Sequence, residues 1–447
     1  MTKKDIFWID NYIRIWYLKE IYDCKNLLKY RWIQKYLINF FRDVTLPSLV
    51  LLYYKQSYKH CFLSFLKHSN ILKYIHKNII FLIKGHIKTI QDIVECINND
   101  FKNIDDIEII WDVHWKFHTK ISITSFWKQF VITWNNFFSD NIIINLSTKI
   151  LNTNLSWLYI KKWNFYYRDF IAYSNNITNR NIAECFYGDL WKKLAFLSAL
   201  RSIDLHYENM LISDNNPYIF DFECILYPSI INDEYSLSIA WILNDTWWED
   251  FTILSWWRWN RMSLLTPMLT SIWRNPKIFW TSRSKRKMLH IPESYWKKIN
   301  PYIFRNSFNH SFNETIKKII KNRKEIENTL INNKIYNRIL IRPTRVYYAI
   351  IRDFILEQSV TDNSIDYKEF FYNQLIHLPI IPNIEKTDDL INSEIECLKV
   401  GVIPSFYSEI HEKLLFNSNE KIVSYLYETC FSVEKQHLDQ LDNFILK

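Results

Sequence analysis

The chain has 447 residues, of which 48% are hydrophobic and 23% are charged, as in an ordinary folded globular protein. Its 56 Lys and Arg exceed its 47 Asp and Glu by nine, and this mild, scattered excess gives no reason to expect a nucleic-acid partner. No apolar run approaches the ~20 residues of a membrane span, and the first residues lack the apolar stretch of a secretory signal. The seven Cys are widely spaced without a zinc-binding pattern, as for structural thiols in a reducing cytoplasm. We therefore expect a cytoplasmic protein without a membrane span.

The glycine and tryptophan contents are inverted. The chain holds 3 Gly and 19 Trp, whereas average usage of ~7% Gly predicts roughly 30 Gly at this length. Several Trp stand where a glycine-rich loop is expected, as in residues 255–260 (SWWRWN). We hypothesise that most of these Trp are Gly in the natural protein, as happens where the codon UGA encodes glycine. The alternative is a genuinely Trp-rich chain, and the codons or the mass of the natural protein distinguish the two.

The first part of the chain favours helices and then strands. Up to about residue 100, apolar residues recur every three or four positions, which is typical of helices. From Ile107 the apolar spacing shifts towards two. That spacing predicts short strands separated by polar turns, near residues 107–110, 120–123, 129–132, 158–160 and 165–171.

A long helix is predicted over residues 182–203, where leucines recur on one face. A tight polar segment follows, and then two short apolar strands, residues 210–212 and 218–220, around a Ser-Asp-Asn-Asn-Pro turn. Residues 225–310 are irregular. Beyond Phe312 we expect only helices, over residues 315–332, 345–356, 367–376, 388–398 and 421–446.

The polar segment carries the pattern Asp204-x-His206-x-x-Asn209, and the second strand of the hairpin ends on Asp221. Phosphoryl transfer needs a carboxylate beside the attacking hydroxyl, and an Asn and a second Asp that hold Mg²⁺ against the phosphates of ATP. A spacing of five places Asp204 and Asn209 on one loop, and the hairpin returns Asp221 alongside it. The pattern therefore predicts a site for phosphoryl transfer. The plainer alternative is a loop of solvated polar side chains.

The residues around this pattern resemble those of a known family. Residues 189–228 resemble the core of the dehydratase domain of class II lanthipeptide synthetases, the LanM type, in which a long helix leads into T-D-L-H-x-E-N, a hairpin and D-x-E-x-L-x-x-P. Residues 110–114 (IWDVH) resemble the family's G-D-x-H turn, with Trp111 at the position of its Gly. Residues 338–347 (RILIRPTRVY) resemble its R-x-x-x-R-x-T-x-x-Y block. The three blocks occur in the family's order.

The resemblance implies two reactions on a ribosomally made precursor peptide. A Ser or Thr hydroxyl is phosphorylated from ATP, and the phosphate is then eliminated to leave dehydroalanine or dehydrobutyrine. The residues that the resemblance assigns to phosphorylation are Asp204, His206, Asn209 and Asp221, with Asn209 and Asp221 on Mg²⁺.

The resemblance assigns other residues to elimination. Arg338 would offer a fork of donors to the departing phosphate, and Thr344 a hydroxyl donor to the same group. Asp112 and His114 belong to the same active-site set, and we favour a part in elimination for them. Spacing alone favours a plainer interpretation of Arg338 and Thr344, a salt bridge at a helix entry and an N-cap.

One strand departs from the family's pattern. The family carries a Lys in a Y-K-P-R context shortly after G-D-x-H, where it would contact the phosphates of ATP. Here the corresponding segment, residues 130–136 (FVITWNN), has no Lys, and Lys128, Lys161 and Lys162 are out of register. Loss of that cation removes phosphate binding and charge stabilisation. Either another base substitutes for it, or the kinase step is weakened or absent.

The predicted fold class is α+β, with a lipid-kinase-like bilobal catalytic core and extensive helical elaborations. The expected divisions are an N-terminal helical region (1–105), a strand-rich lobe (106–175), a lobe with the catalytic loop (176–310) and a C-terminal helical region with the elimination residues (311–447). The resemblance includes no cyclase domain in this sequence, so we expect a separate cyclase and a peptide exporter as partners beside the precursor peptide. Two alternatives stay open: a kinase of the same fold without elimination, and a degenerate pseudoenzyme that binds only a peptide or nucleotide.

Overall fold

The computed structural model describes residues 27–40, 69–101, 103–109, 120–126, 128–133, 139–162, 165–175, 177–221, 223–230, 266–269, 278–281, 291–294, 297–360 and 366–441. Helices open this part of the chain, as predicted. A 3-10 turn η2 (Leu27–Lys29) leads into a helix over residues 31–40, and α4 (Ser69–Asp100) follows. Apolar side chains of α4 that recur every three or four residues are buried, namely Ile83, Ile87, Ile90, Val94 and Ile97.

A five-stranded antiparallel sheet follows α4. Its strands are β1 (Ile104–Ile109), β2 (Ile121–Ser125), β3 (Lys128–Thr133), β4 (Ile160–Lys162) and β5 (Phe165–Asp169), in the spatial order β1-β2-β3-β5-β4. α5 (Asp140–Leu151) is inserted between β3 and β4. Ile107, Ile121 and Ile123 are fully buried, and the two alternating isoleucines of β2 lie on one face of the sheet.

The next segment is a long helix and a hairpin, as predicted. α6 (Arg180–Ala199) begins at Asn179, whose side chain accepts a hydrogen bond from the Ile182 amide and so satisfies a free N–H of the first turn. The 3-10 turn η4 (Tyr207–Asn209) leads into β6 (Met210–Ser213) and β7 (Asn216–Ile219), which pair in a two-stranded ribbon. Two more ribbons follow, β8 (Thr266–Leu269) with β9 (Ile278–Thr281) and β10 (Glu293–Ser294) with β11 (Lys297–Lys298).

The last third is helical only in part. After η5 (Pro301–Phe304) come α7 (Arg305–Lys321), which packs on α6, and α8 (Arg323–Asn332). β12 (Tyr336–Arg338) precedes α9 (Thr344–Val360), α10 (Tyr367–His377) and α11 (Asp388–Leu398). Then β13 (Phe406–Glu409), β14 (Leu414–Asn417) and β15 (Ile422–Tyr425) form with β12 a four-stranded antiparallel sheet, and α12 (Cys430–Asp439) follows.

This sheet corrects the expectation of an all-helical region beyond residue 311. Residues 406–425 are strands and turns, and the helix expected over 421–446 starts only at Cys430. All four side chains of β13 are buried, and so are the two central side chains of β15. Without strict alternation, these two strands carry no period-two signal in the sequence.

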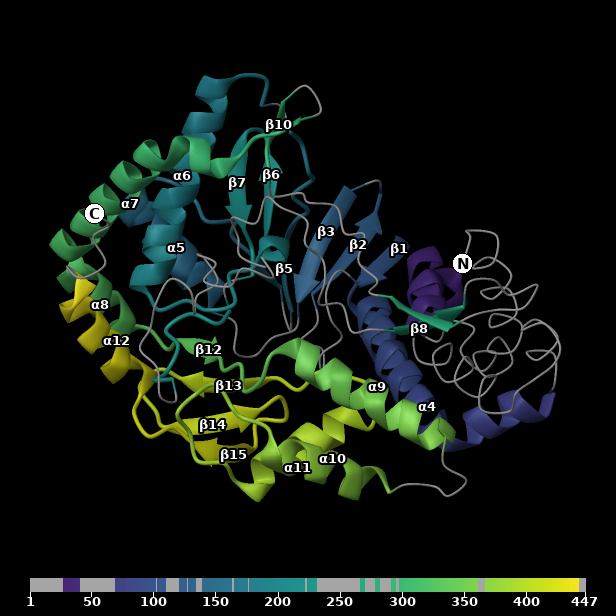
Figure 1. The fold of residues 1–447 in the computed structure, drawn as a ribbon. Coiled ribbons are helices and arrows are strands. Elements are labelled where there is room, and N and C mark those ends of the chain that lie inside the picture. Colours follow the sequence, from purple (N-terminus) through teal and green to yellow (C-terminus); the bar gives the residue numbers. More distant parts are fainter. Residues whose placement is uncertain are drawn as a thin grey trace.

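Two hydrophobic clusters hold the structure together. One joins α5, α6 and the β6–β7 hairpin to α7, α8 and the four-stranded sheet. The other joins the five-stranded sheet and α4 to α9, α10 and α11, and Figure 1 shows α9 running beside α4 below that sheet. Segments from early and late parts of the described chain thus share one core. The fold is α+β, as predicted.

None of the helices among the described residues combines the length and the apolar character that crossing a bilayer requires.

Candidate active site

The predicted catalytic loop is built at the C-terminal end of α6. After the loop, the β6–β7 hairpin returns to it, and the Phe220 amide donates to the Asn209 carbonyl at 3.1 Å. Beyond Asp221 the chain stays alongside, because the Ile203 amide donates to the Cys224 carbonyl at 2.9 Å. These backbone bonds hold Asp221 beside the loop that carries Asp204 and Asn209.

The backbone of this loop is strained. Asp204 has a φ of 63°, and Arg201 and Leu226 beside it have φ of 46° and 53°. Such left-handed conformations are unfavourable for residues other than Gly, and they cluster at functional sites. The amide of the buried Asn209 side chain donates to the Asp204 carbonyl at 2.9 Å, and its Oδ1 atom is buried without a hydrogen-bond partner among the described residues. His206 lies half-buried on the same loop.

A lysine that the sequence did not single out reaches this loop. Lys120 precedes β2, and its buried ammonium Nζ lies 2.9 Å from Oδ1 of Asp221 and 2.7 Å from Oε1 of Glu223. Burial by itself lowers the pKa of Lys120, but the two carboxylates outweigh burial and raise that pKa well above its ordinary value. Lys120 is therefore a fixed, charged cation beside the predicted Mg²⁺ ligand Asp221.

The register of the sheet explains why Lys120 can take this place. β2 and β3 pair with Ile121 opposite Ile132. Continuing the register by one residue places Lys120 opposite Thr133, at the end of β3. Lys128 has a side chain that is 70% exposed, and Lys161 is also exposed. Lys120, immediately before β2, thus brings a cation to the end of β3, where the sequence itself has no Lys.

Arg338 joins the same cluster from the C-terminal part of the chain. It ends β12, its side chain is buried, and its amide donates to the Glu223 carbonyl at 3.0 Å. Burial by itself lowers the pKa of the guanidinium, and its neighbours Cys224 and Glu223 reverse this and raise it. The pKa of Glu223, which burial alone would raise, is lowered by Lys120 and Arg338. The site therefore joins residues predicted for phosphorylation to Arg338, predicted for elimination.

A further carboxyl group faces this charge cluster. Asp140 is buried at the first turn of α5. Burial raises its pKa to about 7, Lys120 opposes that rise, and Glu223 and Asp221 add to it. Next to it, Ser139 accepts a hydrogen bond from the Tyr336 amide at 2.9 Å, which ties α5 to β12. Asp140 thus adds a third acid near Lys120.

The remaining predicted residues are placed less closely or not at all. Thr344 is half-buried and is the first residue of α9, so it follows the helix boundary instead of capping it. Asp112 and His114 lie outside the described residues. The codon hypothesis concerns four Trp that also lie outside the described residues, namely Trp111, Trp256, Trp257 and Trp259.

Sequence reasoning missed Lys120, Glu223 and Asp140. Glu223 could have been found, because it is the acid of the D-x-E wording that follows the hairpin. The one indication of Lys120 in the sequence is a charged residue at the start of the predicted alternating strand 120–123. Its partner Asp221 is 101 residues away, and only the folded chain brings the two together.

One cavity of about 340 Å³ lies elsewhere, between α11 and the turn from β14 to β15. Its lining includes Asp389, Glu396 and Asn417, and none of the charged residues described above. The Asn417 amide already donates to Ser393 at 3.0 Å. The charge cluster, not this cavity, is the candidate active site.

A family model described as a domain of unknown function, DUF4135, matches residues 281–409. The match includes Arg338 and Thr344 and ends on the last residue of β13. No curated protein matches the chain.

Proposed function

We propose that the protein is a LanM-like peptide dehydratase. It would phosphorylate Ser and Thr of a precursor peptide from ATP and then eliminate the phosphate to leave dehydroamino acids. Hydroxide is a poor leaving group and phosphate a far better one, which is the chemical reason for the two steps. The single observation that carries the proposal is the ion cluster in which Lys120 binds Asp221 and Glu223 beside Arg338.

The family match supports the same proposal. The DUF4135 domain is found in LanM-type lanthipeptide synthetases, and here it covers the block with Arg338 and Thr344. We also propose that the core is lipid-kinase-like and bilobal, with the five-stranded sheet as one lobe and α6 with its loop and hairpin as the other. In that arrangement the charge cluster lies between the lobes.

The loop residues fit a magnesium ion. Mg²⁺ is bound by hard oxygen ligands, and Asn209 offers a buried Oδ1 atom without a described partner beside a carboxylate of Asp221. Asn209 and Asp221 would hold Mg²⁺, which, when bound, neutralises charge on the phosphates of ATP. The orphaned amide oxygen is otherwise costly, so a ligand there has a physical reason.

The chain's own groups divide the remaining work of phosphorylation. Asp204 accepts the proton of the Ser or Thr hydroxyl. His206 lies on the same loop as Asp204. The Lys120 ammonium, held by Asp221 and Glu223, would supply to the phosphates the positive charge expected from the family's strand Lys.

Elimination then uses residues on the other side of the cluster. A base takes the Cα proton as the Cα=Cβ bond forms and the Cβ–O bond breaks, and Arg338 would bind the departing phosphate, to which Thr344 also donates. Asp112 and His114 would contribute to this step. A separate cyclase would close any rings, and a peptide exporter would carry the product.

The experiment is incubation with ATP, Mg²⁺ and a Ser/Thr/Cys-rich candidate precursor peptide, followed by mass spectrometry. Loss of one water per modified residue supports the dehydratase. Gain of a phosphoryl group alone indicates a kinase without elimination, and no change indicates a binding protein. Asp221→Asn should abolish both products, while Arg338→Ala should accumulate the phosphorylated peptide. An unphosphorylated product from Arg338→Ala would contradict the role given to Arg338.

A further inference from the structure

We propose that Arg342 is a positioning residue for elimination: its buried side chain fixes the start of α9 and so sets Thr344 relative to Arg338. The inference rests on the proposed function. Arg342 is the second arginine of the block that ends at Tyr347, and the structure sends the two arginines to opposite surroundings. Arg338 faces the charge cluster, whereas the side chain of Arg342 is fully buried towards α10 and α11.

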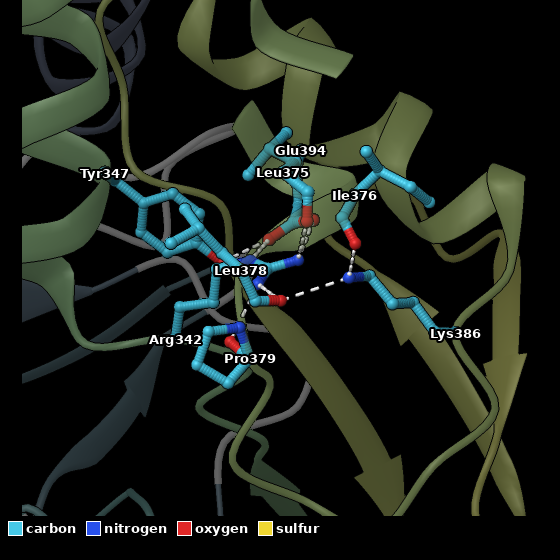
Figure 2. A network of polar contacts seen from close by, with 8 residues as sticks. All are labelled: Arg342, Tyr347, Leu375, Ile376, Leu378, Pro379, Lys386 and Glu394. Atoms are coloured by element: carbon cyan, nitrogen blue, oxygen red, sulfur yellow. Dashed lines mark hydrogen bonds and ion pairs between the residues drawn. The ribbon is translucent and has the colours of Figure 1, made fainter. Parts of the chain in front are cut away.

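The guanidinium of Arg342 is fully engaged, as Figure 2 shows. Its Nε donates to Oε1 of Glu394 at 2.9 Å, and Nη2 donates to Oε2 at 3.4 Å. Nη1 donates to the carbonyls of Leu378 and Pro379 at 2.7 and 2.8 Å. Nη2 also donates to the Leu375 carbonyl at 3.0 Å. The guanidinium therefore joins Glu394 of α11 to the C-terminal end of α10.

Tyr347 binds the same carboxylate from the first turns of α9. Its hydroxyl donates to Oε1 of Glu394 at 2.7 Å, so Arg342 and Tyr347 converge on one acid from both sides of Thr344. Lys386 donates to the Leu378 carbonyl at 3.0 Å and to the Ile376 carbonyl (Figure 2). Burial raises the pKa of Glu394, and Arg342 opposes that rise.

Arg338 has separate anchors. The Ile339 amide donates to the Phe406 carbonyl at 2.8 Å, and the Tyr227 hydroxyl donates to the Leu340 carbonyl at 2.7 Å. The segment from Arg338 to Thr344 is thus fixed on the active-site side by these hydrogen bonds and on the α9 side by Arg342. A shift at Arg342 would move Thr344 while Arg338 stays in place, which disturbs elimination and spares phosphorylation.

Lysine cannot reproduce this arrangement. Its ammonium is a compact charge that can stay near Glu394, but it lacks the planar fork that reaches two helices at once. Arg342→Lys therefore keeps the buried charge and loosens the turn. Arg345→Lys makes the same chemical change one residue beyond Thr344 at an exposed position, and it is the matched control.

The test measures both half-reactions on one synthetic Ser/Thr/Cys-rich peptide, made with free serine or with phosphoserine at one position. With ADP and Mg²⁺, we expect Arg342→Lys to eliminate phosphate from the phosphoserine peptide roughly ten- to hundredfold more slowly. With ATP, its rate of phosphorylating the serine peptide should match the wild type. Tyr347→Phe, which keeps the ion pair, should shift the ratio of phosphorylated to dehydrated product in the same direction. Arg345→Lys should behave as the wild type.

Two results overturn the inference. One is an Arg342→Lys protein with the wild-type product ratio, and the other is equal slowing of both half-reactions. If Arg342→Lys fails to fold, as circular dichroism would show, a wild-type ratio in Tyr347→Phe decides against the inference. A wild-type protein that forms neither product overturns the proposed function instead, and this inference with it.

Discussion

Lys120 is a single buried charge, and its surroundings show why it is tolerated. Removing an ammonium from water is costly unless it is paired and hydrogen-bonded. Lys120 meets Asp221 at 2.9 Å and Glu223 at 2.7 Å, so each group compensates for the burial of the others. Removing one partner of such a set leaves an uncompensated charge.

If the proposed function holds, Lys120→Met should lower the rate of peptide phosphorylation by about a hundredfold or more, because it deletes the charge assigned to the phosphates. It should also destabilise the fold by about 3–5 kcal/mol. Phosphorylated product, counted by mass spectrometry on protein shown to be folded, checks the first effect, and urea unfolding checks the second. Lys128→Met is the matched control on the next strand, and equal loss in both variants would refute the role of Lys120.

The residues of the candidate site could be predicted from sequence only where they are close in the chain. Asp204, Asn209 and Asp221 lie within one loop and hairpin, so motif spacing places them together. Lys120 and Asp140 come from β2 and α5, and their approach depends on the register of a sheet and on helix packing. Those are tertiary properties without a local sequence signal.

At the scale of elements, the early strands, α4 and α6 were predictable from the spacing of their apolar residues. Alternation marks β2, and three- and four-residue spacing marks α4 and α6. The C-terminal sheet was missed because β13 is buried on every residue. Before α12, apolar residues of β15 also fall at helical intervals, so a helix was predicted across the boundary.

The β6–β7 hairpin is attached to α6 by Lys193. Its buried Nζ donates to the Pro217 carbonyl at 2.5 Å and lies 3.0 Å from Oδ2 of Asp189. Lys193→Met should leave these acceptors unpaired and lower the free energy of unfolding by about 1–3 kcal/mol. Lys192→Met changes the exposed neighbour and should have little effect. Equal urea midpoints for the two variants would contradict this attachment.

α12 carries a buried acid against the end of α6. Both carboxyl oxygens of Glu434 are buried without a hydrogen-bond partner in the described part of the chain. Burial raises its pKa to about 8, while Arg201 opposes the rise. The ordinary pKa is 4.5, so between these values the folded state keeps a proton that the unfolded state releases. Stability is then lost as pH rises through this window.

Glu434→Gln should remove that loss, which amounts to roughly 1.4 kcal/mol per pH unit. The clean range is pH 7 to 8. At lower pH, Asp140, whose pKa burial raises to about 7, adds a loss of the same sign. Below pH 6.5, His437, whose pKa is lowered to about 4 by burial and by Arg201, acts with the opposite sign. The measurement is urea unfolding at several pH values for Glu434→Gln, the wild type and the exposed control Glu428→Gln. Parallel stability curves for all three proteins would show that Glu434 does not titrate in this range.

Across the whole molecule, segments far apart in the chain pack together. α9, α10 and α11 share a core with α4 and the five-stranded sheet, whereas the four-stranded sheet shares one with α6. The charge cluster draws its residues from both groups, since Lys120 precedes β2 and Arg338 ends β12. Segments far apart in the chain assemble the site, which is why local pattern predicts some of its residues but not its complete membership.

The glycine deficit also concerns the whole molecule, and one turn gives it a structural test. β2 and β3 are joined by two residues, because Ser125 pairs with Lys128, and the first of them, Phe126, has a φ of 49°. Two-residue hairpins of this kind favour Gly, often at the second position, which is Trp127. Trp191 offers the opposite environment, since its buried ring lies against Phe308 and Phe312 in the core.

Codon reassignment therefore predicts different outcomes at these two positions in the natural protein. Turn chemistry predicts Gly at residue 127, and packing predicts that residue 191 is a true Trp. Trypsin cuts after Lys and Arg, so it releases residues 121–128 and 181–192 as separate peptides. Their masses should show the first peptide lighter by the difference between Trp and Gly, and the second as written. A first peptide with the written mass would leave the Trp-rich chain as the correct interpretation at this turn.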